Sequence, residues 1–182
     1  MDVYPLLFAS TLSAGTVLAL AALGLLINEK AGIVNLGAEG MMLCAAIAGF
    51  AAVVHTGSDI LGFVAGMAAG AVMAAAFGWL VIWLNANQYA TGLALALFGA
   101  GFSAFVGIGY VQAKLPERPR FDWLGLGDVP IIGPALARQH PLVYGAVLLA
   151  LALVWFLYRT RAGLVLRSVG ESPESAHALG YP

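Results

Sequence analysis

The sequence predicts an all-α fold: a polytopic transmembrane helix bundle with about five spans and a short helix after the last one. Of its 182 residues, 62% are hydrophobic and only 9% are charged, whereas a soluble domain carries about 25% charged residues. The apolar residues gather in runs of about 20, the length a helix needs to cross a bilayer. In lipid such runs satisfy their backbone groups as helices.

Each apolar run is a candidate span, and none contains Lys, Arg, Asp, Glu or His: residues 6–27, 41–54, 60–84, 92–113 and 141–158. The second run reaches spanning length only if its helix begins near Ile33, so its expected range is 33–54. We therefore expect one transmembrane domain over residues 1–182, closed by a polar segment at 159–182.

The third span carries small residues every four positions, on one helix face. They are Gly62, Gly66, Gly70, Ala74 and Gly78. A similar run in the second span is Gly40, Cys44, Ala48 and Ala52. Small residues let helices approach closely in lipid, so we expect helix packing at Gly62, Gly66, Gly70 and Gly78. A lipid-facing or dimer role is the alternative.

Several classes of function have little support. Eight Lys and Arg against nine Asp and Glu leave no basic patch for nucleic acid. The three histidines and the single Cys44 show no metal-ligand spacing, and no phosphate-binding P-loop motif or catalytic triad is present. We therefore expect neither a metal site nor an enzyme.

Charge counting does not orient the chain. Crossings alternate, which places four cations on each side: Lys30, Arg159, Arg161 and Arg167 on one, and Lys114, Arg118, Arg120 and Arg138 on the other.

The polar tail predicts a second helical piece after the mixed-polarity segment 163–169. Ser172, Pro173 and Glu174 are typical of a helix start, and Gly180 followed by Pro182 is typical of a stop. A helix over Pro173 to Leu179 is too short to stand alone. We expect its apolar face, Ala176 and Leu179, to be exposed and to need something to pack on: the membrane surface or a soluble partner.

Four segments resemble permease subunits of bacterial ABC importers, in the family that serves branched-chain amino acids, ribose, simple sugars and nucleosides. Residues 163–176 are similar to the cytoplasmic segment of that family, 28–42 to the loop and second-helix start of the simple-sugar and nucleoside branch, 85–94 to the segment before a central helix, and 130–135 to an external loop. The resemblance covers nearly the whole chain.

The resemblance implies a permease whose segment 163–180 faces the cytoplasm and couples to an ATPase. Coupling is then expected at Gly170, Glu171, Ser172, Pro173, Glu174, Ala176 and Leu179. The implied partners are an ABC ATPase that carries ATP and Mg, a second permease subunit, an extracytoplasmic solute-binding protein and the lipid bilayer, with no cofactor in this chain. The implied location is the bacterial inner membrane, with residues 28–40 inside and 114–140 outside. Because the resembled permeases continue for several further helices, we expect a partial permease.

Polar side chains near the helix starts are candidates for the substrate path: Asn35, Glu39, Asn87, Gln88 and Thr91. Neutral amides donate and accept hydrogen bonds, which suits sugar hydroxyls or nucleobase edges. Asn35 and Glu39 share a face if the second helix starts early. The alternative is helix capping and interfacial solvation.

Two other functions remain open from the residues alone. Broken helices near Gly37 or Gly92 are compatible with an ion-coupled secondary transporter or channel fragment, and the glycine stripes with a structural membrane protein. The charge-free spans favour a permease driven by a separate ATPase, because ion-coupled carriers usually hold ionisable residues within the membrane.

Overall fold

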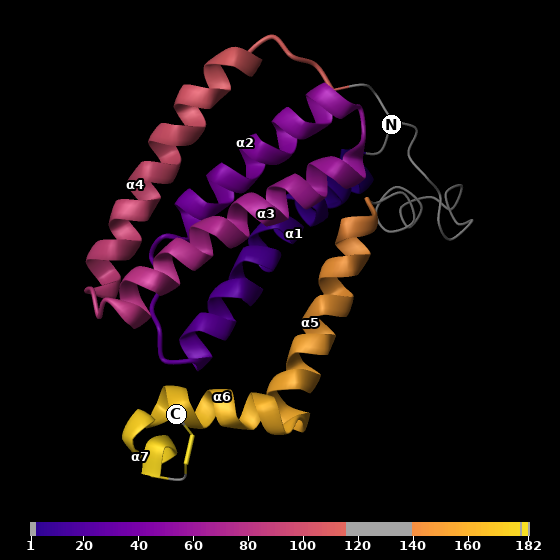
Figure 1. The fold of residues 1–182 in the computed structure, drawn as a ribbon. Helices are drawn as coiled ribbons and strands as arrows, with labels where there is room; N and C mark the ends of the chain where they lie inside the picture. Colours follow the sequence, from indigo (N-terminus) through magenta and orange to yellow (C-terminus); the bar gives the residue numbers. More distant parts are fainter. Residues whose placement is uncertain (1–2, 116–139, 179, 182) are drawn as a thin grey trace. The chain divides into compact units, whose positions relative to one another are not determined.

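The computed structural model describes residues 3–115, 140–178 and 180–181 (Figure 1). The chain divides into two compact units. One unit is Met1–Gly32 with Arg118–Pro182, and the other is Ile33–Glu117. Helices dominate the described residues, and no strand occurs among them. The all-α prediction is confirmed.

Five helices of the described chain are long and apolar enough to cross a membrane. They are Leu7–Lys30, Ala38–Thr56, Asp59–Trp83, Gln88–Tyr110 and Pro141–Arg159.

The unit Ile33–Glu117 contains α2 (Ala38–Thr56), α3 (Asp59–Gly78), a π-helical turn η1 (Trp79–Trp83), α4 (Gln88–Gly107) and a 3-10 turn η2 (Ile108–Tyr110).

A tight turn joins α2 to α3. Gly57 has φ 68°, a left-handed conformation that glycine adopts at little cost, and its N–H donates to Val53 O at 2.8 Å. Ser58 then caps α3 by accepting from Leu61 N.

Helix α2 starts at Ala38, five residues after the start expected near Ile33. Asn35 prevents the early start, because its Oδ1 accepts from Gly37 N at 2.9 Å and so forms a local turn instead of a helical one. Residues 33–37 are therefore extended or turn-like.

Helix α2 packs closely against both of its neighbours in this unit. A Cβ placed on Gly49 would lie 3.0 Å from Gly62 O, and one on Gly66 would lie 3.1 Å from Ala45 O. On the other neighbour, a Cβ on Gly99 would overlap the backbone of Gly40. Glycine thus permits backbone-to-backbone contact of α2 with α3 and with α4.

The other unit contains α1 (Val3–Lys30), α5 (Pro141–Arg159), α6 (Arg161–Glu171) and α7 (Pro173–Ala178). Helix α6 runs across the end of α5 rather than continuing it (Figure 1). Thr160 makes the corner: its backbone is extended, its hydroxyl donates to Phe156 O at 2.6 Å, and the same oxygen accepts from Gly163 N at 3.0 Å. One residue therefore ends α5 and caps α6.

Candidate functional site

Helix α6 is fixed to the end of α1 by a contact between two glycines. Gly32 follows α1 with φ 81°, and a Cβ placed there would lie 3.0 Å from Gly170 O. A Cβ on Gly170 would lie 2.8 Å from Gly32 N and would overlap Lys30 O. The last turn of α6 therefore rests directly on the backbone that ends α1.

The start of α6 is fixed to α5 in the same manner. A Cβ on Gly163 would lie 2.7 Å from Leu157 Cα, and Leu157 is only 1% exposed. The Arg167 guanidinium carbon lies 4.7 Å from the centre of the Tyr158 ring, a cation–π distance. Both ends of α6 are thus held against the ends of α1 and α5.

Helix α7 begins at Pro173 as expected, and Ser172 Oγ accepts from Ser175 N. Ala176 is only 3% exposed. The expectation that its methyl group is exposed is therefore wrong: α7 packs on α6, and Ala176 is buried. Leu179 lies outside the described residues.

The coupling residues that face outward are Glu171, Pro173 and Glu174, which are exposed. Ser172 is half-buried, and Gly170 packs against the backbone of Gly32. The exposed part of the segment is therefore short, polar and negatively charged.

A second group of predicted residues lies where the loop before α2 meets the start of α4. The backbone N–H of Val34 donates to Gln88 Oε1 at 3.0 Å. Asn35 is 9% exposed. A Cβ on Gly92 would lie 2.9 Å from Leu36 N, so the loop rests on the first turns of α4. The buried Asn35 and the half-buried Gln88 therefore each accept from a backbone N–H of this loop, at Gly37 and at Val34, where the loop rests on α4.

The remaining candidates for the substrate path, Asn87, Glu39 and Thr91, do not hold the loop before α2. Asn87 Oδ1 caps α4 by accepting from Tyr89 N at 3.0 Å and Ala90 N at 3.1 Å. Glu39 is exposed in the first turn of α2, and Thr91 is half-buried one turn into α4. Because α2 begins only at Ala38, the early start on which a shared helical face of Asn35 and Glu39 depended does not occur.

The stripe of the third span faces α2 over part of its length. Gly62 and Gly66 meet the α2 backbone or side chains, and a Cβ on Gly70 would lie 3.8 Å from Ala45 Cβ. Gly78 has only Ile82 nearby, in the following turn. It therefore makes no close packing contact within the described residues.

Sequence reasoning missed Gly49, Gly92 and Gly99 as contact points. Gly92 and Gly99 are seven residues apart, which places them on one face two turns apart. That spacing was a usable signal, whereas the Gly32–Gly170 pair had none beyond a glycine that follows a helix.

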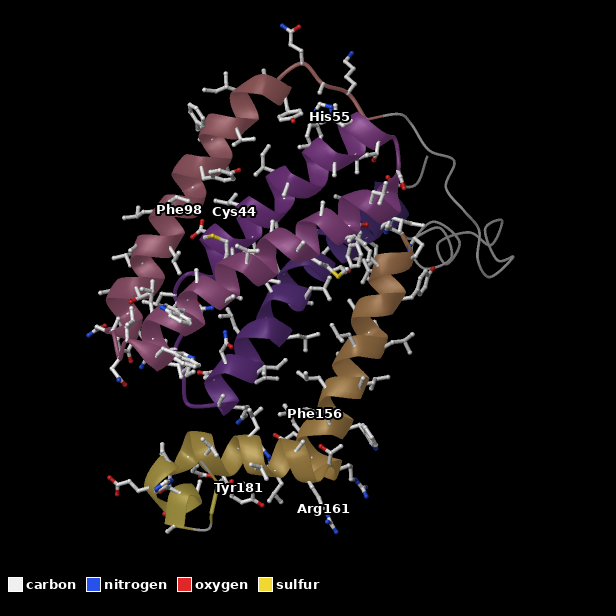
Figure 2. The ribbon with its side chains drawn as sticks, in the orientation of Figure 1. Cys44, His55, Phe98, Phe156, Arg161 and Tyr181 are labelled. Carbon is white, nitrogen blue, oxygen red and sulfur yellow. The ribbon has the colours of Figure 1, made fainter. Side chains whose placement is uncertain are left out.

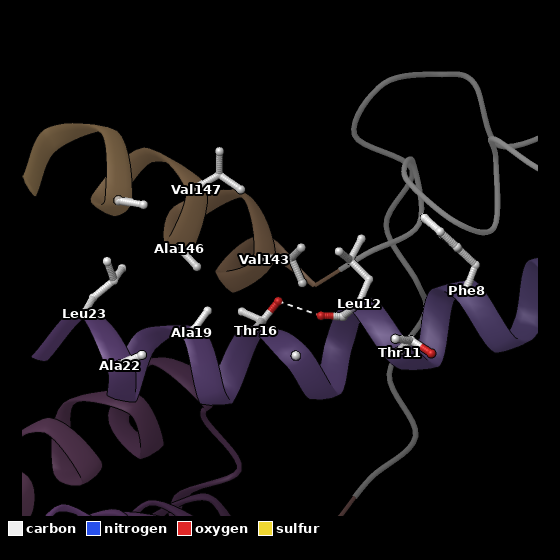
Figure 3. Close-up of a pocket in the computed structure, with 12 residues that line it drawn as sticks. Phe8, Thr11, Leu12, Thr16, Ala19, Ala22, Leu23, Val143, Ala146 and Val147 are labelled. Carbon is white, nitrogen blue, oxygen red and sulfur yellow. Dashed lines mark hydrogen bonds between the residues drawn. The ribbon is translucent and has the colours of Figure 1, made fainter. Parts of the chain in front are cut away.

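An apolar groove of about 540 Å³ runs between α1 and α5 (Figure 3). Its few hydroxyls already bond within α1: Thr16 Oγ1 donates to Leu12 O and Thr11 Oγ1 to Leu7 O, each at 2.8 Å. The groove therefore offers apolar surface to its surroundings.

Among the described residues no group of three His, Cys, Asp or Glu side chains is placed to hold a metal ion.

The family described as branched-chain amino acid transport system / permease component matches residues 7–182. The chain belongs to this permease family. The resemblance drawn from its motifs is thereby confirmed, and membership favours a permease over an ion-coupled carrier or a structural protein.

Relatives include a putative glucose ABC transporter permease protein of Haloferax volcanii, which is 43% identical over 97% of this chain and 55% of its own length. A guanosine ABC transporter permease protein of Bacillus subtilis is 33% identical over 99% of this chain and 60% of its own. A nucleoside ABC transporter permease protein of Lactococcus lactis subsp. cremoris is 27% identical over 96% and 59%. The chain thus spans just over half the length of these relatives. No solved structure matches it.

Proposed function

We propose that the chain forms the transmembrane part of an ATP-binding cassette importer and contributes to the path of a small polar solute such as a nucleoside or simple sugar. The observation that carries this proposal is the docking of α6 on the ends of α1 and α5, in a chain of the permease family. A helix held by backbone contacts transmits a push on α6 to α1, because packed interiors give way little.

The ATPase meets the exposed acidic part of the segment, at Glu171 and Glu174. Gly170 and Ala176 act beneath that surface, by holding α6 and α7 in place. The ATPase supplies ATP and Mg, and this chain supplies no catalytic group. Energy then enters from outside the spans, which agrees with the confinement of their Asp, Glu, Lys, Arg and His residues to the first or last turn of each spanning helix.

The assembly includes a second permease subunit and an extracytoplasmic solute-binding protein, in a cell membrane that the chain crosses several times. Residues 28–40, 85–91 and the tail then lie on the cytoplasmic side. The relatives named for glucose, guanosine and nucleosides support the solute class.

Within the solute path, Glu39, Asn87 and Thr91 are the contact residues. Glu39 and Asn87 are exposed, and the half-buried Thr91 lies one turn after Asn87, with its N–H donating to Asn87 O. Asn35 and Gln88 support the path from beneath, through the backbone groups that they hold.

The test of coupling uses the chain co-expressed with the ATPase encoded beside its gene. Reversing both charges, Glu171→Lys with Glu174→Lys, lowers co-purification of the ATPase about tenfold, since unlike charges that face each other become like charges. Lys114→Glu reverses a charge at the other end of the spans and leaves co-purification unchanged. Full retention by the double variant contradicts the coupling surface.

The test of function is uptake of labelled guanosine and glucose by proteoliposomes that hold the complete importer. We expect uptake to require ATP and to survive ionophores that collapse ion gradients. Uptake that persists without ATP and stops with the ionophores contradicts the proposal and favours an ion-coupled carrier.

A further inference from the structure

The corner between α5 and α6 concentrates positive charge. Arg159, Arg161 and Arg167 lie within nine residues, and no Asp or Glu occurs from 159 to 170. Arg159 and Arg161 are exposed, and Figure 2 shows Arg161 projecting away from the helices. None of the three forms an ion pair with any residue that the structure describes. Within the described part of the chain, the corner thus offers guanidinium donors that form no ion pair.

Arg167 is the most constrained of the three. Its guanidinium lies over the Tyr158 ring at 4.7 Å, and its Nε is buried without a hydrogen-bond partner among the described atoms. The contact with the ring restricts the movement of the guanidinium. A restrained, planar group of donors suits bidentate binding of an oxyanion better than a mobile ammonium would.

Exposed apolar and aromatic side chains lie close in sequence to these arginines. Trp155 is 63% exposed, Tyr158 58% and Leu164 60%. Arg161, Leu164 and Arg167 are three residues apart, so they follow one another along one side of α6. Gly163 and Gly170, seven residues apart, mark the side that packs on α5 and α1. Helix α6 therefore presents an apolar residue flanked by two arginines.

We propose that this corner binds the headgroup of an anionic phospholipid. Arg161 and Arg167 donate to the phosphodiester, Arg159 adds long-range attraction, and Leu164 and Trp155 enter the acyl boundary. Charge complementarity sets the sign of the ligand. The apolar and indole surface, continuous with the α5 span, selects a lipid over free phosphate, because phosphate has nothing to place there.

This role differs from the coupling surface proposed above. Arg159 ends α5 and Arg161 begins α6, whereas Glu171 ends α6 and Glu174 lies in α7. Arg167 lies between them on α6, where its guanidinium is held over the Tyr158 ring of α5. The tail therefore presents cations toward lipid at the α5–α6 corner and carboxylates toward the ATPase from the end of α6 onward. The lipid site anchors the corner while the acidic end stays accessible.

The experiment measures lipid at the corner directly, through quenching of Trp155 fluorescence by brominated lipids in nanodiscs of the full chain. Trp79, Trp83 and Trp123 are replaced by Phe so that Trp155 is the only indole. Brominated phosphatidylglycerol, mixed into phosphatidylcholine, is compared with the same fraction of brominated phosphatidylcholine. We expect local enrichment of the anionic lipid by about fivefold per arginine that binds it, and hence clearly stronger quenching by phosphatidylglycerol.

Variants decide whether the arginines cause this preference. Arg161→Gln, at an exposed position that leaves the fold intact, reduces the preference, and Arg161→Gln with Arg167→Gln abolishes it. Lys114→Gln removes a cation at the other end of the spans, and this variant is expected to retain the preference for phosphatidylglycerol. Inorganic phosphate at millimolar concentration leaves quenching unchanged if the ligand is a lipid.

Equal quenching by the two lipids in the parent chain overturns the proposal. So does a preference that survives the double substitution, or one that inorganic phosphate removes. A double variant that keeps its lipid preference but no longer co-purifies with the ATPase assigns the arginines to the protein partner instead.

Discussion

In the unit Ile33–Glu117, α2 touches α3 and α4 along their lengths, with glycine at Gly49, Gly62, Gly66 and Gly99. In the other unit the closest contacts lie at one end, where α6 meets the ends of α1 and α5, and the two long helices leave an apolar groove between them. Because lipid supplies little hydrophobic drive, close packing holds membrane helices together. The first unit is therefore held by its spans, and the second chiefly by the helix that follows them.

The largest effect is expected from a substitution that breaks the α2–α4 contact. A Cβ on Gly99 overlaps the Gly40 backbone, which cannot rotate away as a side chain can. Gly99→Ala is therefore expected to lower the free energy of unfolding by about 2–3 kcal/mol. Gly101→Ala, two residues along the same helix with nothing within 4 Å, is the matched control. Titration with SDS followed by circular dichroism measures both, and equal losses contradict the contact.

The next largest effect is expected from breaking the contact between α6 and the end of α1 in the other unit. Gly170→Ala forces α6 away from Gly32, at a cost of about 1–3 kcal/mol. Trypsin cleavage after Arg161 and Arg167 then accelerates at least about tenfold, because local opening exposes the chain. Gly145→Ala, in open space on α5, leaves the cleavage rate unchanged. Unchanged cleavage of the Gly170 variant shows that the glycine contact does not hold α6.

A smaller effect concerns the junction between the α2 loop and α4. Gln88→Ala leaves the Val34 N–H without its acceptor, at a cost of about 1–2 kcal/mol. Amide hydrogen exchange at Val34 is expected to speed up roughly tenfold. Gln88→Glu retains an acceptor and much of the protection, and Gln112→Ala, at an exposed position, has no effect. Unchanged exchange in the alanine variant rejects the structural role of Gln88.

The smallest effect separates capping from substrate contact. Asn87→Ala removes the cap of α4 and lowers the free energy of unfolding by about 1 kcal/mol. Asn87→Asp keeps the capping oxygen and restores stability. If Asn87 also contacts solute, Asn87→Asp lowers uptake while stability is retained. Uptake equal to that of the parent assigns Asn87 to capping alone.

The helical spans were predictable because hydropathy is a local property summed over about 20 neighbouring residues. The start of α7 was predictable for a similar reason, since Ser172 and Pro173 act within one turn. The start of α2 was not. An apolar Ile33 and Val34 read as helix, but the Asn35 side chain and the support from Gln88 and Gly92 keep the loop extended.

The roles of individual glycines were likewise predictable only in part. The spacing of Gly62 and Gly66 indicated a packing face, yet nothing in it distinguished them from Gly78, which meets no other helix among the described residues. Ala176 read as an outward apolar face and is buried, because whether a methyl group is exposed depends on what lies opposite it.

The sequence by itself determined the all-α membrane class, the candidate spans and, through its motifs, the permease family. Only the tertiary structure decided which glycines carry backbone contacts and that α6 is fixed to the end of α1. The physical reason is range: burial in lipid depends on each segment's own composition, whereas a contact such as Gly32 with Gly170 needs two segments far apart in the chain to arrive at one place.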